Sequence, residues 1–326
     1  MKTPVYSGII TNYTCTASCR HCMFASSPAC EKDFITPEMS EHLASLLQEA
    51  GTRGVHIGGG EPFMNFPALC SLIDALNRHG IGVDYIETNA FWAADTEFAR
   101  KRLLRLKELG VDCVMVSVDP FHIEYVPLER PLQLIRLLRE CGMDYFIWKE
   151  QYLWKLMKLD HSRTYKKEEL QSLLTVNYIT ETAEEYGLGM NGRALAIARD
   201  MFTLRPAEFW LKHTACPSIG EVQHCHLDLY GNLIPSRCTG LAAEARDYLS
   251  GNLPAESYPV LSRLHEGGTK ALYEYALSHG FQPDPAGYPS HCALCYDMRR
   301  YLRRKHPSSD LEPGDYYREM DQLLYP

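Results

Sequence analysis

The sequence lacks a long apolar segment, a secretion signal and an excess of basic residues, and each absence excludes a class of protein. No run of about 18 apolar residues occurs, so a membrane-spanning helix is excluded. Residues 1–10 carry one lysine and only a short apolar patch, too little for a secretion signal. The 33 Lys and Arg residues are outnumbered by 41 Asp and Glu, giving a formal net charge of −8 without the basic excess of nucleic-acid-binding proteins. We therefore expect a cytoplasmic protein with neither a membrane nor a nucleic-acid partner.

Cysteine, by contrast, is abundant, with twelve in 326 residues. In a chain that is not secreted, this number indicates metal sites rather than a disulfide framework. Most of the cysteines fall into three groups: residues 15–30, residues 216–238, and the pair Cys292 and Cys295. The remaining three stand singly in apolar periodic segments, where core packing is expected; they are Cys70, Cys113 and Cys141.

Strand-like apolar runs alternate with segments of helical periodicity through the first 150 residues. The runs are centred near Ile9, His56, Tyr85, Val116 and Phe146, and the last four are separated by about thirty residues, the length of a βα unit. Such alternation predicts a parallel sheet covered by helices. In a barrel of this kind, the active-site residues follow the carboxyl ends of the strands.

The rhythm changes in the second half of the chain. Residues 149–187 have helical character, and a sixth strand is expected to run into residues 189–194. From about residue 200, turn residues and cysteines replace the βα pattern. The sequence therefore predicts an α/β fold, with a partial (β/α)6 barrel of the TIM type in residues 1–205. A small cysteine-rich iron–sulfur domain is expected in residues 206–326.

A loop of three cysteines, Cys15, Cys19 and Cys22, follows the first predicted strand. Thiolates are soft ligands, and three in one loop suit an iron–sulfur cluster or zinc. Since a four-iron cluster usually takes four cysteines, three would leave one iron open to a substrate or cofactor. The alternative is a zinc site completed by His21 or Cys30.

The C-x3-C-x2-C spacing of this loop resembles the signature of the radical S-adenosylmethionine (SAM) enzymes, with His21 in place of their usual aromatic residue. One βα unit later, Gly58-Gly-Gly-Glu61-Pro62 is similar to the GGEP motif of the same family. Consecutive glycines weaken a strand unless something approaches their backbone closely. By resemblance, Gly59, Gly60 and Glu61 hold the amino group of SAM. The two motifs together disfavour the zinc alternative.

Other residues of the cofactor site follow from the same resemblance. Asn89 ends the third strand and is expected near SAM, although a plain loop role is the alternative. Ser117 and Asp119 resemble positions that contact the ribose or carboxylate of SAM, with helix capping by Asp119 as the alternative. Arg193 is expected to pair with the SAM carboxylate, or else to form a surface ion pair. His122 is a candidate catalytic acid or base, or a structural hydrogen-bonding group.

The later cysteines surround a predicted hairpin with the sequence Asp228-Leu-Tyr-Gly-Asn232. This layout resembles the SPASM and twitch extensions, which bind an auxiliary four-iron cluster. The resemblance assigns four ligands: Cys216, Cys238, Cys292 and Cys295. Cys225 is left as an alternative ligand or as a free thiol that donates a hydrogen atom to a substrate radical. A zinc site is the alternative use of the four ligands.

The resemblance implies a reaction as well as a fold. An external reductant such as flavodoxin or ferredoxin would reduce a [4Fe-4S] cluster, which would cleave SAM to a 5′-deoxyadenosyl radical. That radical would remove a hydrogen atom from a substrate, with post-translational epimerisation, crosslinking or oxidation of a ribosomal peptide as the leading hypothesis. The alternatives are a small-molecule dehydrogenase or rearrangement enzyme and a non-catalytic iron–sulfur or zinc protein.

Overall fold

A single eight-stranded sheet organises the computed structural model, which describes residues 2–4, 6–189, 191–212, 216, 218–219, 222, 224–236 and 238–324. The strand order is β5-β4-β3-β2-β1-β6-β7-β8, and all neighbours from β5 to β6 are parallel. The strands are β1 (Tyr6–Ile10), β2 (Gly54–Gly58), β3 (Gly82–Thr88), β4 (Cys113–Val116), β5 (Asp144–Phe146), β6 (His224–Asp228), β7 (Asn232–Pro235) and β8 (Ala243–Glu244). The predicted α/β class with a parallel core is confirmed.

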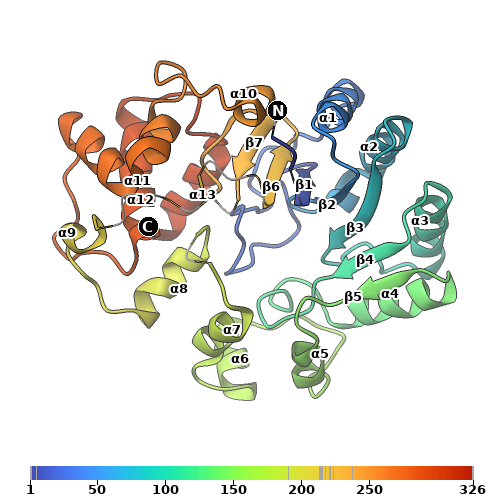
Figure 1. Ribbon diagram of the computed structural model, residues 1–326. Coiled ribbons are helices and arrows are strands. Elements are labelled where there is room, and N and C mark those ends of the chain that lie inside the picture. Colours follow the sequence, from blue (N-terminus) through green and yellow to red (C-terminus); the bar gives the residue numbers. More distant parts are fainter. Residues whose placement is uncertain are drawn as a thin grey trace.

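Helices connect the parallel strands and follow one another along the outer face of the sheet (Figure 1). In this first part of the chain they are α1 (Pro37–Glu49), the 3-10 turn η1 (Pro62–Asn65), α2 (Phe66–Arg78), α3 (Thr96–Glu108) and α4 (Glu129–Glu140). Three short helices then replace a further βα unit, as the helical character of residues 149–187 predicts: α5 (Glu150–Leu156), α6 (Lys167–Leu173) and α7 (Tyr178–Tyr186).

The remaining helices lie beyond the β6–β7 side of the sheet (Figure 1). They are α8 (Ala194–Met201), α9 (Ala207–Trp210), α10 (Ala245–Ser250), α11 (Pro259–Ser278), α12 (His291–Lys305) and α13 (Gly314–Leu324). Within the described part of the chain, every helix is too short or too polar to cross a lipid bilayer.

Local sequence signals explain most of the helix boundaries. Thr36 caps α1 by accepting a hydrogen bond from the Met39 amide at 3.1 Å, and Pro37 begins the helix. The apolar face of α1 is buried, as its periodicity predicts. Phe98 of α3 is exposed, and the Arg102 guanidinium lies over its ring, 4.2 Å from the ring centre.

The sixth parallel strand is not where the sequence pattern suggests. Described residues 191–193 form a turn, α8 begins at Ala194, and Met190 lies outside the described residues. The sixth strand is instead β6, which pairs with β1 over five residues, on the opposite side of β1 from β2. The predicted hairpin is confirmed, because β6 and β7 are antiparallel and joined by a tight turn. The sheet thus continues from the barrel into the cysteine-rich C-terminal region.

Candidate active site

A cavity of about 600 Å³ lies inside the curved sheet. The cysteine loop and residues that follow β2, β3 and β4 contribute to its wall, as expected for the carboxyl ends of parallel strands. Nine of the predicted site residues line it: Cys15, Cys19, Cys22, Gly59, Gly60, Glu61, Asn89, Ser117 and His122.

The three thiols of the cysteine loop face this cavity together. Cys15 and Cys19 are buried, and burial raises the pKa of each thiol because an isolated thiolate is poorly solvated there. A bound metal reverses that preference, since a coordinated thiol is deprotonated. Three convergent sulfur donors therefore fit an iron–sulfur cluster. Cys30, the alternative fourth ligand, does not line the cavity and instead contacts Ser27 within the loop.

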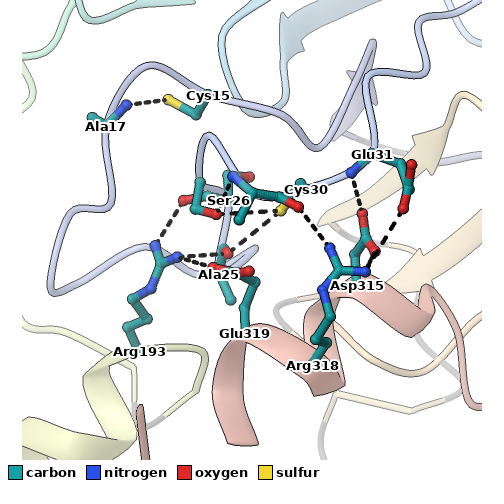
Figure 2. Close-up of polar contacts among 12 residues, drawn as sticks. Cys15, Ala17, Ala25, Ser26, Cys30, Glu31, Arg193, Asp315, Arg318 and Glu319 are labelled. Atoms are coloured by element: carbon teal, nitrogen blue, oxygen red, sulfur yellow. Dashed lines mark hydrogen bonds and ion pairs between the residues drawn. The ribbon is translucent and has the colours of Figure 1, made fainter. Parts of the chain in front are cut away.

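The second half of the loop is held by helices from the far end of the chain. Figure 2 shows Arg193 and the α13 residues Asp315, Arg318 and Glu319 converging on residues 25–31. The Arg193 guanidinium donates to the carbonyl oxygens of Ser26 at 2.7 Å and Ala25 at 2.8 Å. A carboxylate oxygen of Glu319 lies 3.3 Å from it.

Arg193 is therefore not placed as the resemblance suggests. It is buried and lies outside the wall of the cavity, with its guanidinium directed to the loop backbone. Its own amide donates to the Cys22 carbonyl at 3.0 Å. The geometry supports a role in holding the cysteine loop rather than the SAM carboxylate, and it also differs from the surface ion pair considered as the alternative.

The glycines after β2 allow two loops to touch. Gly60 donates its amide to the Asn12 carbonyl at 2.7 Å, and Glu61 donates to the Thr14 carbonyl at 3.1 Å. A Cβ atom on Gly60 would lie 1.9 Å from the Thr14 carbonyl oxygen, and one on Gly59 would lie 2.7 Å from that of Asn12. Gly59 also has a φ of +142°, which favours glycine. The absence of side chains at Gly59 and Gly60 therefore lets the backbone of Asn12 and Thr14, at the start of the cysteine loop, approach closely.

Glu61 presents a buried carboxylate at the cavity wall. It accepts hydrogen bonds from the Asn89 amide at 2.8 Å, the Thr88 hydroxyl at 2.9 Å and the Phe63 amide at 3.2 Å. Burial outweighs these donors and raises the pKa of Glu61 to about 7. A carboxylate that is poorly stabilised in this way is suited to pairing with a cationic group such as an ammonium.

Asn89 and Ser117 both line the cavity. The side-chain nitrogen Nδ2 of Asn89 donates to the Thr16 hydroxyl at 3.1 Å and lies 3.7 Å from the Cys15 sulfur. Ser117 lines the cavity, and its backbone amide is bonded to the Thr88 carbonyl at 2.9 Å. Their predicted contacts with SAM remain predictions, with positions that permit them.

Asp119 lies behind the cavity wall rather than in it. One of its oxygens caps the turn that follows, accepting from the Phe121 and His122 amides, which is the capping alternative noted from sequence. Its second oxygen lies 2.6 Å from His122 Nδ1 and accepts from the Tyr186 hydroxyl at 3.1 Å. Burial opposes ionisation, but His122 and His21 outweigh it and lower the pKa of Asp119.

His122 lines the cavity, so the predicted acid or base is in reach of a bound molecule. Burial would lower its pKa, but Asp119 and the Cys19 thiol raise it well above its usual value. His21 also faces the cavity, with Nε2 at 3.7 Å from Asp119. It packs against the Phe121 and Tyr186 rings at centroid distances of 5.1 Å, which explains how a histidine replaces the usual aromatic residue.

Cys225 is positioned differently from the prediction. Side chains alternate between the two faces of a strand, and the β6 residues on either side of Cys225 line the cavity. Cys225 is fully buried on the other face, next to Ser7 of β1, with which it is paired in the sheet. This placement does not offer its sulfur to a radical in the cavity, so the structure does not support a hydrogen-donor role.

The predicted auxiliary ligands come together in part. The thiol of Cys238 lies close enough to that of Cys216 to lower the pKa of Cys216 to about 6. Cys295 is near enough to interact electrostatically with both, and Arg299 adds a positive charge beside them. Cys292 lies one turn before Cys295 in α12. This donor set fits a metal or iron–sulfur group, with Arg299 offsetting the thiolate charge.

Three histidines in the cavity were missed by the sequence reasoning: His56 on β2, and His224 and His226 on β6. The signal available in the sequence was the i, i+2 spacing of His224 and His226, which directs both side chains to one face of a strand. Pairing of β6 with β1 could not be read from that spacing.

Comparison with known proteins agrees with the site geometry. Residues 9–148 match the family described as the Radical SAM superfamily. The putative peptide biosynthesis protein YydG of Bacillus subtilis (strain 168) is 24% identical over 112 residues, covering 34% of this chain and 35% of YydG. The chain is thus aligned with about one third of the length of that curated relative.

Solved structures show more distant similarity. The structure described as native anSMEcpe with bound AdoMet is 12% identical, covers 92% of this chain and 97% of its own, and gives a TM-score of 0.45. SuiB of Streptococcus suis is 15% identical, covers 87% and 77%, and gives a TM-score of 0.44.

Proposed function

We propose that this protein, whose residues 9–148 match the Radical SAM superfamily, uses Cys15, Cys19 and Cys22 to hold a [4Fe-4S] cluster and binds SAM in the adjoining cavity. When bound, the cluster and SAM supply a 5′-deoxyadenosyl radical that removes a hydrogen atom from a substrate carbon. The observation that carries the proposal is the convergence of three cysteines, Glu61 and Asn89 on one cavity.

Residues of the chain would bind and orient SAM. The Glu61 carboxylate is available to the SAM ammonium, and the attachment of Gly60 and Glu61 to the cysteine-loop backbone fixes this group relative to the cluster ligands. Asn89 and Ser117 offer polar groups on the neighbouring strand ends. His122, whose Nδ1 is held by Asp119, would give or take a proton at its other ring nitrogen. Asp119 does not line the cavity, so we assign it the role of orienting His122 rather than of contacting SAM directly.

We further propose that the substrate is a ribosomally made peptide that undergoes epimerisation, crosslinking or oxidation. The support is the similarity to YydG, whose name describes a peptide biosynthesis protein. Trp148 lies at the cavity with 57% of its surface exposed and offers an apolar contact for an extended chain. A small-molecule dehydrogenase or rearrangement reaction is the second candidate, and a partly enclosed cavity of about 600 Å³ is its support.

The C-terminal cysteines would hold a second, auxiliary four-iron cluster. The closeness of Cys216 and Cys238, the proximity of Cys295 and the position of Cys292 one turn earlier support four ligands at one place. Residues 206–326 would then form the cluster-binding unit and residues 1–205 the barrel. A flavodoxin- or ferredoxin-type protein is the proposed reductant.

The test is anaerobic reconstitution with iron and sulfide, followed by dithionite and SAM, with 5′-deoxyadenosine measured by mass spectrometry. We expect 5′-deoxyadenosine from the wild type and none from Cys19→Ser, while the control Cys70→Ser, outside the cavity, retains activity. Wild-type protein that carries the cluster, binds SAM and still forms none would contradict the proposal.

The substrate class needs a separate measurement. Candidate peptides encoded beside the gene are incubated with the loaded enzyme in heavy water and analysed for mass and for deuterium at α-carbons. Epimerisation predicts one deuterium at the inverted α-carbon, and crosslinking or oxidation predicts loss of two hydrogens. Unchanged peptides together with turnover of a small molecule would establish the second candidate instead.

A further inference from the structure

Three histidines meet inside the barrel, away from the cysteine ligands. One ring nitrogen from each of His56, His224 and His226 lies within 4.8 Å of the other two. Their ring centres are 4.9 to 5.6 Å apart, and all three rings line the cavity that the cysteine loop also faces. His56 and His226 are almost completely buried.

The sheet register creates this meeting point. Gly8 in β1 is paired with His56 on one side and with His226 on the other, so the two histidines flank a residue that has no side chain. A Cβ atom on Gly8 would lie 2.3 Å from His56 Nε2 and 2.4 Å from His226 Cδ2. The rings therefore occupy the space above Gly8. Tyr6, paired with His224, stacks on His56 at 5.2 Å and closes one side.

The three rings form a donor set rather than an ordinary apolar core. A neutral imidazole keeps a lone pair on one ring nitrogen and is the commonest metal ligand among side chains. The buried Nδ1 atoms of His56 and His226 make no hydrogen bond of good geometry among the described residues. Buried polar atoms of this kind call for a partner.

A carboxyl group stands beside the histidines. Glu87 Oε1 lies 3.9 Å from His56 Nε2 and lines the same cavity. A cation between the histidines and Glu87 would favour the ionised form of this group and be partly neutralised by it.

From this arrangement we propose that His56, His224 and His226 bind one divalent first-row transition metal ion, with zinc as its representative. Imidazole suits zinc, iron, nickel and copper, and three protein nitrogens with an open position are typical of a catalytic zinc site. Zinc–nitrogen bonds of about 2.0–2.1 Å put ligand atoms roughly 3.4 Å apart in a tetrahedron, within reach of small ring rotations from the present spacing.

The open coordination position would face the cavity. An oxygen or nitrogen of a substrate could bind there as to a Lewis acid, which would anchor the substrate inside the barrel beside the SAM site. This role in anchoring depends on the proposed radical SAM function, whereas binding of the ion depends on the three histidines alone.

Metal analysis of the iron-loaded protein tests the site, because iron–sulfur clusters then occupy the cysteines. Protein is equilibrated with Zn²⁺, freed of loose metal by gel filtration, and analysed for zinc and iron. We expect about one zinc ion per chain in the wild type, and near none in His56→Gln or His226→Gln, with iron unchanged. His79→Gln, a histidine at the exposed end of α2, is the control and should keep its zinc.

Gly8→Ala tests the geometry without removing a ligand, and its added methyl group should abolish zinc binding. X-ray absorption at the zinc edge of the wild type is independent of how the variants fold, and it should show nitrogen and oxygen ligands only. Sulfur ligation, or equal zinc in the wild type and both histidine variants, would overturn the site. Formation of 5′-deoxyadenosine is measured on the same samples, so failure of the radical SAM proposal is seen separately.

Discussion

Gly60 shows how a single residue without a side chain brings two loops of the site together. The Thr14 carbonyl of the cysteine loop occupies the place where a Cβ atom would be, and the adjacent Glu61 amide is bonded to that carbonyl. The position of the Glu61 carboxylate relative to the cysteine ligands follows from this contact. Gly8 likewise leaves free the space that the His56 and His226 rings occupy. Small residues thus determine where the reactive side chains lie.

We predict that Gly60→Ala destabilises the protein by about 3 kcal/mol or more, because a methyl group would lie against backbone that cannot rotate away. Gly82→Ala is the control, since its Cβ atom would have only an ordinary contact of 3.7 Å; we expect a change within about 0.5 kcal/mol. Urea unfolding of both variants under anaerobic conditions measures the difference. Equal stability of the two variants would contradict the close approach.

At the scale of elements, the cysteine loop is held between α8 and α13. Arg193 precedes α8 and reaches the loop carbonyls, while Arg318 of α13 donates to the Ala29 carbonyl at 2.8 Å (Figure 2). Asp315 accepts from the Glu31 amide. Residues more than 160 positions away in the chain therefore stabilise the loop that carries Cys15, Cys19 and Cys22.

We predict that Arg193→Ala costs about 3 kcal/mol of unfolding free energy, because it leaves two carbonyls and the Glu319 carboxylate buried without their partner. It should also speed the loss of iron from the Cys15–Cys22 loop. Arg199→Ala, which removes an exposed pairing with Asp284, should change stability by less than about 0.5 kcal/mol. Urea unfolding and the rate of iron transfer to a chelator measure the two effects.

Asp310 provides a pH-dependent contribution at the start of α11. Its buried carboxylate accepts the Val260 and Leu261 amides at 2.7 and 2.8 Å, yet burial dominates and raises the pKa of Asp310. A carboxyl group with a raised folded-state pKa stabilises the fold below its unfolded pKa, and this contribution is lost as pH rises through the folded value.

We therefore expect the stability of the wild type, relative to Asp310→Asn, to decrease as pH rises above about 4. The amide oxygen can still accept both backbone donors, so the variant should fold. Thermal unfolding of both proteins between pH 4 and pH 7 measures the trend. In Glu41→Gln the trend should have the opposite sign, because the hydrogen bond from Arg78 lowers the pKa of Glu41. A relative stability of the wild type that increases with pH would contradict the assignment for Asp310.

At the scale of the whole molecule, one sheet joins the barrel to the cysteine-rich region. The parallel pairing of β6 with β1 puts the hairpin next to the first barrel strand, although more than 200 residues separate them in sequence. The same sheet carries His56 on β2 and both His224 and His226 on β6, so their meeting also depends on this pairing.

Two clusters predict a defined iron content. Fully reconstituted wild type should contain about eight iron atoms per chain, and Cys238→Ser combined with Cys295→Ser should contain about four. After reduction with dithionite, this double variant should still form 5′-deoxyadenosine, because the cysteines of the barrel loop are unchanged. Cys113→Ser is the control and should keep the wild-type iron content. About four iron atoms in the wild type would exclude the auxiliary cluster.

The sequence alone determined the alternation of strands and helices, the cap of α1, the hairpin, and the cysteine and glycine motifs that follow β1 and β2. These features depend on local periodicity and spacing, which a linear pattern contains. Only the tertiary structure decided that Cys225 faces away from the cavity while His224 and His226 face into it, because the neighbour of β6 sets which face is inside. It also decided that Arg193 holds the cysteine loop, since the partners of a buried guanidinium come from residues distant in the chain.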